Sequence, residues 1–292
     1  MITKTQAGVN EGDDRLLAVQ QARRRALLVP REHGAWGLLL IPLFTGIAAG
    51  FAASHRSWPL IVFTLATLCL FWLRTILESL LGTGPVKAST SEERSTAVTA
   101  AISLSAVSVL CLALLMWRGR NLDLFLLGAV AGCAFVAQAA VRRLGKRARM
   151  ASQLIGTIGL TCTAPAAYYV ATGRLDLRAI VLWVANWVFA GNQIHFVQLR
   201  IHAARAVTVA EKFERGKLFL ITQFLFVATL VCAALWRLLP PLMILAFVPV
   251  IVRGTHWFFR KPQSLDVKRL GWSEMKHGMA FGSLLAIALI CS

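Results

Sequence analysis

The stretch STAVTAAISLSAVSVLCLALLMW, residues 95–117, contains no Asp, Glu, Lys or Arg. A helix needs about 20 residues to cross about 30 Å of hydrocarbon, so this run is long enough to span a membrane. Similar runs recur along nearly the whole chain, which is 57% apolar and only 15% charged. Soluble domains usually carry about 25% charged residues. The sequence therefore excludes an ordinary soluble globule and predicts a polytopic membrane protein.

Uncharged runs of this kind predict an all-α fold of nine transmembrane helices. The runs cover residues 34–53, 58–73, 95–117, 124–141, 150–173, 179–199, 218–236, 238–252 and 278–292. Apolar pairs after Arg74 extend the second helix by one or two turns, and the ninth should start near Trp272. The eighth run is short and rich in proline, so the last two segments form either two full spans or a hairpin that does not cross.

The positive charges predict the orientation of these helices. Of the 31 Lys and Arg residues, 25 fall in alternate connections on one side of the predicted membrane and 6 on the other. Cytoplasmic connections carry the excess of Lys and Arg, so the N-terminus should be cytoplasmic and the C-terminus external. Basic loops beside anionic lipid headgroups also explain the net charge of +18 without a nucleic acid partner.

Residues 1–30 are predicted to form a basic cytoplasmic tail before a single nine-helix domain, residues 31–292. The run Arg23-Arg24-Arg25 with its apolar neighbours fits either an interfacial amphipathic helix or a solvated tail that carries an orientation signal. A cleaved signal peptide is not expected, because no short apolar core with a cleavage site follows the long charged lead. The six cysteines show no C-x-x-C spacing and are interpreted as apolar packing residues.

Ionisable residues gather at the cytoplasmic ends of the first two predicted helices. Glu32 and His33 stand at the entry of the first span, where charged groups are costly unless they are paired or hydrated. An interfacial cap is the alternative interpretation. Arg74 and Glu78 form an i,i+4 pair at the end of the second span. Lys87 follows a glycine-rich turn, a combination that suits an anionic ligand.

The sixth predicted helix carries a polar stripe near its cytoplasmic end, formed by Asn192, Gln193, His195 and Gln198 ahead of Arg200. Asn and Gln also hold helices together in lipid, so a structural role is the alternative. Glu274 and His277 lie at the start of the last predicted span.

Intramembrane polar groups mark functional sites by default, and these clusters predict one polar pocket that faces the cytoplasm. Its catalytic candidates are Glu32, Glu78 and His195. Its ligand-binding candidates are His33, Arg74, Lys87, Asn192, Gln193, Gln198, Arg200, Glu274 and His277.

The string VPREHGAWG, residues 29–37, followed by an apolar run and Pro42, resembles the opening signature of the YwiC-like family of bacterial membrane proteins. The stretches Gln193-x-His195 and Gly271-Trp272-x-Glu274 are also similar to that family, so the resemblance covers nearly the whole chain after residue 29. It implies a protein of the bacterial cytoplasmic (inner) membrane, in a family without an assigned biochemical activity.

The predicted architecture also resembles, more distantly, the UbiA-type intramembrane prenyltransferases, which have nine spans and a cytoplasmic N-terminus. In that superfamily Asp-rich motifs after the second and sixth spans hold Mg²⁺, which binds the diphosphate of an isoprenoid donor. The corresponding connections here contain no Asp, so Mg²⁺ is disfavoured, no cofactor is predicted and no catalytic residue transfers. Basic residues such as Arg74, Lys87 and Arg200 can instead bind a phosphate directly.

Three functions compete at this point. The favoured prediction is a YwiC-like protein that binds, and in an enzymatic version transforms, an isoprenoid or other anionic lipid in a UbiA-like scaffold. The alternative is a non-enzymatic transporter or binder of a lipid or small anion. A third is a haem or transition-metal site built from His33, His195, His202 and His277. The predicted partners are the lipid bilayer and the anionic lipid, and nothing in the sequence indicates an oligomeric state.

Overall fold

The computed structural model describes residues 23, 27, 33–55, 57–83, 86–117, 119, 122–145, 148–236, 240–261 and 265–291, with side chains undescribed at 33–35 and 241. All regular structure within these ranges is helical. Nine helical stretches there are long and apolar enough to cross a membrane. The prediction of an all-α, multi-pass membrane protein is therefore confirmed.

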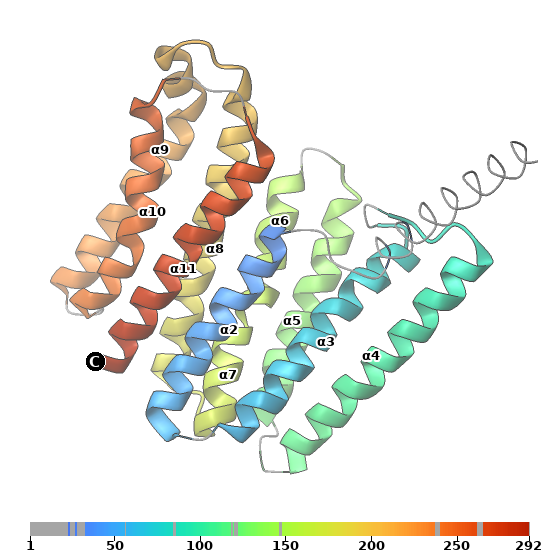
Figure 1. Ribbon diagram of the computed structural model, residues 1–292. Coiled ribbons are helices and arrows are strands. Elements are labelled where there is room, and N and C mark those ends of the chain that lie inside the picture. The colour runs from blue at the N-terminus through green and yellow to red at the C-terminus, as the bar shows by residue number, and fades with distance from the viewer. Residues whose placement is uncertain are drawn as a thin grey trace, which may run out of the picture. The chain divides into compact units, whose positions relative to one another are not determined.

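The helices follow the predicted order along the chain (Figure 1). They are α2 (His33–Ser54), α3 (Trp58–Leu80), α4 (Ser91–Trp117), α5 (Leu122–Arg142), α6 (Arg149–Thr161), α7 (Thr163–Thr172), α8 (Leu177–His202), the short η2 (Ala203–Arg205), α9 (Val209–Leu235), α10 (Pro241–Phe259) and α11 (Val267–Cys291).

Helix ends differ from the predicted runs where charged residues continue a helix. As predicted, α3 extends past Arg74, to Leu80. The last helix begins at Val267, earlier than the predicted start near Trp272, and the Asp266 carboxylate accepts a hydrogen bond from the Arg269 backbone N–H at 3.0 Å. Both α10 and α11 meet the length and hydropathy of a membrane span. By these two criteria, neither is too short to cross.

The fifth predicted span is divided in two. Helix α6 ends at Thr161 and α7 begins at Thr163, with Cys162 between them. Pro165 lies in the first turn of α7, where its missing N–H cannot serve the preceding helix. Beside the break, the indole N–H of Trp183 donates to the Thr161 hydroxyl at 3.2 Å and to the Ile158 backbone oxygen at 3.4 Å. The uncharged run predicted the span but not its interruption.

The described chain separates into two compact units. Among the described residues, the first comprises Arg23, Leu27 and those between 62 and 114, and thus contains most of α3 and α4. Within it, the Glu93 carboxylate at the start of α4 accepts hydrogen bonds from the Ser89 backbone N–H at 2.8 Å and from Arg23 Nε at 2.5 Å. Apart from Arg23 and Leu27, the predicted tail lies outside the described residues.

The second unit, residues 33–61 and 115–292, holds seven of the full-length helical stretches (Figure 1). Helix α8 contacts α2, α6, α7, α9 and α10, whereas α11 packs on both α2 and α10. Helix α2 packs most extensively on α7, and an added Cβ at Gly46 would lie 2.3 Å from the Ala164 carbonyl oxygen. Small residues therefore let these two backbones approach closely.

Aromatic rings from three helices form the centre of this unit. Phe189 of α8 stacks on Phe281 of α11 with ring centroids 4.1 Å apart, and Phe247 of α10 contacts Phe281 at 5.1 Å. All three side chains are buried. This packing fixes α8, α10 and α11 against each other and so positions the polar side chains that the same helices carry.

Candidate functional site

A cluster of polar side chains lies inside the second unit, where α8, α9, α10 and α11 meet. It consists of Asn192 and Gln193 on α8, Gln223 on α9, Arg253 on α10 and Glu274 on α11, and is called the buried polar cluster below. Arg253 donates through Nη1 to the Glu274 carboxylate, and both side chains are at most 6% exposed. Three of these five residues were predicted from the sequence as ligand-binding residues, and the structure brings those three together.

Side-chain amides surround the ion pair. Asn192 Oδ1 accepts a hydrogen bond from Arg253 Nη2 at 3.3 Å, and Asn192 Nδ2 donates to Gln223 Oε1 at 2.5 Å. Gln193 Nε2 donates to the backbone oxygen of Glu274 at 3.3 Å. The cluster therefore ties four helices together through uncharged and charged hydrogen bonds.

Two members of the buried polar cluster were missed by sequence reasoning. The uncharged run that ends at residue 252 assigns Arg253 to the following connection, and this assignment is wrong because α10 continues to Phe259 and buries the guanidinium. The apolar string Trp257-Phe258-Phe259 is the signal that could have extended the helix beyond residue 252. Gln223 is a lone amide in an apolar run, and its position alone did not predict a partner.

Aromatic rings connect the buried polar cluster to two further cations. The Arg253 guanidinium lies 4.3 Å from the centroid of the Phe196 ring, and the Arg200 guanidinium lies 6.0 Å from the same centroid. Arg200 also lies 5.6 Å from the Trp257 ring, and Lys212 Nζ lies 4.2 Å from it. Cations within about 6 Å of a ring face are attracted to it, so these contacts hold three cations along one column.

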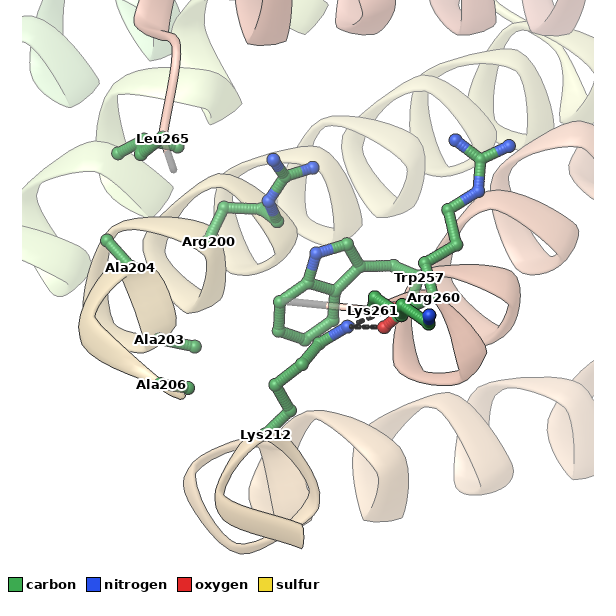
Figure 2. Close-up of a pocket in the computed structure, with 9 residues that line it drawn as sticks. All are labelled: Arg200, Ala203, Ala204, Ala206, Lys212, Trp257, Arg260, Lys261 and Leu265. Atoms are coloured by element: carbon green, nitrogen blue, oxygen red, sulfur yellow. Dashed lines mark hydrogen bonds between the residues drawn. The ribbon is translucent and has the colours of Figure 1, made fainter. Parts of the chain in front are cut away.

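A pocket opens where this column ends, near the C-terminal ends of α8 and α10 (Figure 2). We call it the basic pocket; its volume is about 70 Å³. It is lined by Arg200, Ala203, Ala204, Ala206, Lys212, Trp257, Arg260, Lys261 and Leu265. Four of these residues are cationic, and no lining residue within the described ranges is acidic.

Lys212 is fixed in the wall of the basic pocket. Its ammonium donates to the backbone oxygens of Trp257 at 2.5 Å and Arg260 at 2.7 Å, the dashed contacts of Figure 2. The side chain is 2% exposed. The Trp257 oxygen also accepts from the Arg260 backbone N–H at 3.4 Å, so Lys212 on α9 adds a side-chain donor to the carbonyls at the C-terminal end of α10.

Arg200 is the predicted site residue that reaches the basic pocket. In Figure 2 its guanidinium and that of Arg260 extend past the Trp257 indole on the side away from Lys212. Across the described residues, the Arg200 side chain makes ring contacts but no hydrogen bond and no ion pair. A half-buried guanidinium with five free N–H donors is suited to bind an anion.

The remaining predicted residues of the second unit have other partners. His195 Nδ1 lies 3.3 Å from the Thr222 hydroxyl on α9, and its ring contacts Phe219. Gln198 Nε2 donates to Gln153 on α6 at 2.9 Å. His277 Nδ1 lies 2.7 Å from the Ser273 backbone oxygen on its own helix.

The predicted residues near the first helices fall elsewhere. Arg74 Nε and Glu78 Oε1 form the expected i,i+4 ion pair at 3.2 Å within the first unit, where Lys87 is exposed. Glu32 lies outside the described residues, and of His33 only the backbone, at the start of α2, is described. Across the described ranges, no three His, Cys, Asp or Glu side chains come close enough to hold a metal ion.

Comparison with known proteins adds one finding. Residues 29–168 match the family model described as YwiC-like protein. The match includes the VPREHGAWG string and ends before the second unit's polar residues on α8 to α11. None of the curated proteins matches the chain. Residues 29–168, a little under half of the chain, therefore show the pattern of a YwiC-like membrane protein.

Proposed function

We propose that the whole chain is a YwiC-like protein of the bacterial cytoplasmic membrane that binds the phosphate of an anionic lipid or isoprenoid in the basic pocket. The observation that carries this proposal is Arg200, a guanidinium within a candidate membrane span that has no hydrogen-bonding partner among the described residues. Charged groups inside membrane spans are costly and mark ligand or ion sites by default.

The charges around the pocket support an anionic ligand. Arg200, Arg260 and Lys261 join Lys212 at its wall. A guanidinium binds phosphate oxygens through two parallel hydrogen bonds, which a single ammonium cannot do. Arg200 and Arg260 would hold the phosphate, while Lys212, already bound to two carbonyls, would contribute mainly its charge.

The size of the pocket supports a headgroup rather than a whole lipid. A buried water needs about 10–15 Å³ by a comparable measure, so about 70 Å³ holds a phosphate-sized group but no isoprenoid chain. Exposed apolar residues adjoin the lining residues in sequence, among them Ile201, Val207 and Phe259. A hydrocarbon chain would lie on this outer surface, within the bilayer.

The same pocket volume favours one alternative function, the binding of a free small anion.

The positive-inside count supports a cytoplasmic N-terminus and an external C-terminus, which would place the basic pocket on the cytoplasmic side. The nine candidate spans are the feature shared with the UbiA-type scaffold. The acid–base roles of Glu32, Glu78 and His195 remain predictions from the sequence.

Lipid binding in nanodiscs tests the proposal. The protein is reconstituted in phosphatidylcholine, phosphatidic acid is titrated, and bound lipid is counted by native mass spectrometry. A charge-assisted hydrogen bond contributes about 1.5–3 kcal/mol, so Arg200→Gln should weaken phosphatidic acid binding at least about tenfold. Arg205→Gln is the matched control, since Arg205 is exposed and does not line the pocket.

Four outcomes separate the alternatives. Loss of binding in Arg200→Gln but not in Arg205→Gln supports the pocket as the site. Equal loss in both variants would mean unspecific attraction to a basic surface and would overturn the proposal, as would no loss in either. Competition by inorganic phosphate at comparable concentration would identify a small-anion binder instead of a lipid binder.

A further inference from the structure

The buried polar cluster is not fully satisfied by its own hydrogen bonds. Gln193 Oε1, Gln223 Nε2, Arg253 Nε and Glu274 Oε1 are all buried and have no hydrogen-bond partner within the described residues. Their side chains are at most 8% exposed. Each buried polar group left without a partner costs about 1–3 kcal/mol. Four such atoms in one cluster point to a bound group that pairs with them.

The unpartnered atoms have a definite chemical character. Arg253 Nε and Gln223 Nε2 are donors, whereas Glu274 Oε1 and Gln193 Oε1 are acceptors. The ion pair is formed through one atom of each side chain, Nη1 of Arg253 and Oε2 of Glu274. The second carboxylate oxygen and the Nε–H of the same pair thus remain available.

The charge of the cluster selects an uncharged group. The positive charge of Arg253 is balanced by Glu274, and the other three members are neutral amides. A bound anion would be repelled by the Glu274 carboxylate, and a bound cation would be repelled by the Arg253 guanidinium. Because these two side chains neutralise each other, neither ion would find a free counterion in the cluster. The basic pocket, with four cations, has the opposite preference.

We propose that the buried polar cluster is a second binding site, which takes a hydroxyl group. A hydroxyl has one O–H donor and two acceptor lone pairs. Its oxygen accepts from Arg253 Nε or Gln223 Nε2, and its proton is donated to Glu274 Oε1 or Gln193 Oε1. The hydroxyl belongs either to water or to an amphiphilic alcohol whose chain lies between the helices. The inference concerns residues outside the basic pocket and does not depend on what that pocket binds.

Solid-state NMR on the reconstituted protein tests this directly. Arginine is labelled with ¹⁵N, and the Arg253 Nε signal is identified by its loss in the variant Arg253→Met with Glu274→Met. That double variant is expected to fold, because replacing a buried ion pair by apolar residues of similar volume is often neutral or stabilising. Magnetisation transfer from water protons to Arg253 Nε should be observed in the unmodified protein.

A second titration distinguishes the two sources of the hydroxyl. Addition of 1-dodecanol, with dodecane as the control, should shift the Arg253 Nε signal and abolish transfer from water if an alcohol is the ligand. Persistent water transfer without a shift identifies water itself. The exposed Glu211–Arg215 pair on α9 supplies the matched control, Glu211→Met with Arg215→Met, in which the Arg253 signal should behave as in the unmodified protein.

The proposal is overturned if Arg253 Nε receives no magnetisation from water and does not shift with 1-dodecanol. A shift of equal size with dodecane would also overturn it, because an alkane has no hydroxyl. The Arg253 Nε signal is recorded on the protein with Arg200 intact, whereas the first proposal is tested by phosphatidic acid binding, so the failure of either proposal can be recognised separately.

Discussion

Arg253 on α10 donates a hydrogen bond to the Glu274 carboxylate on α11, and the two side chains are almost completely removed from solvent. A pair of this kind does not by itself stabilise a fold, since desolvation of two charges can exceed their mutual attraction. Breaking it, in contrast, leaves one charge buried alone. The pair therefore dictates which single substitutions the second unit can tolerate.

The first prediction follows from this asymmetry. Glu274→Gln or Arg253→Met should each lower the free energy of unfolding by about 3–5 kcal/mol, because the remaining partner is buried without its counterion. The combined Arg253→Met and Glu274→Met variant should recover most of that loss. Unfolding in mixed micelles with increasing SDS measures all three. If the double variant is less stable than either single variant, the pair contributes net stability and this account is wrong.

Close packing of α2 on α7 gives a second prediction. Gly46→Ala places a methyl group 2.3 Å from the Ala164 backbone oxygen, and overpacking of this kind costs about 1–3 kcal/mol. Gly132→Ala on α5 is the matched control, since no heavy atom lies within 4 Å of its added Cβ. Because alanine loses less backbone entropy on folding than glycine does, Gly132→Ala should raise the free energy of unfolding by about 0.5–1 kcal/mol. Thermal unfolding in detergent compares the two variants.

The membrane architecture could be predicted from the sequence because its signal is carried by composition over long windows. A run such as residues 95–117 has no charged residue, and hydrocarbon tolerates a backbone of this length only as a helix. The break at Cys162 was missed because it leaves hydropathy unchanged. Pro165 lies just after the break, and Trp183 contacts the break from another helix.

The candidate site was only partly predictable for a different reason. Asn192, Gln193 and Glu274 are conspicuous as polar residues in apolar surroundings, and the structure places them in one cluster. Arg253 was hidden by the end assigned to its helix, and Gln223 by its isolation in the sequence. Which polar groups meet depends on how helices rotate against each other, and that follows from packing contacts such as Phe189 on Phe281 rather than from spacing along the chain.

The capping of α10 by Lys212 provides a third prediction. Lys212→Met leaves the Trp257 and Arg260 carbonyls without their ammonium donor, which should cost about 1–3 kcal/mol and loosen the last turn of α10. Hydrogen–deuterium exchange should therefore become faster at residues 257–261. Lys217 is exposed and lies on α9, the helix that carries Lys212, so Lys217→Met should leave the exchange at residues 257–261 unchanged. Equal protection in both variants would show that the two contacts do not hold the turn.

The orientation gives a fourth prediction, which also tests the number of spans. Four exposed residues each lie in a different connection between candidate spans. His55 follows α2, Lys87 follows α3, Arg174 follows α7 and Lys261 follows α10. In a variant whose six native cysteines are replaced by serine, a single cysteine is introduced at one of the four. A membrane-impermeant maleimide added to intact cells should label His55→Cys and Arg174→Cys, but not Lys87→Cys or Lys261→Cys.

Cell disruption should make all four cysteines reactive, which controls for access. The reverse pattern would place the N-terminus outside and contradict the positive-inside assignment. Between Lys87 and Arg174 the chain passes through α4, α5 and the divided α6 and α7. Three crossings put these two positions on opposite sides, so identical labelling would mean that one of these segments does not span. Labelling on opposite sides would instead support a single crossing by α6 and α7 together, despite the break at Cys162.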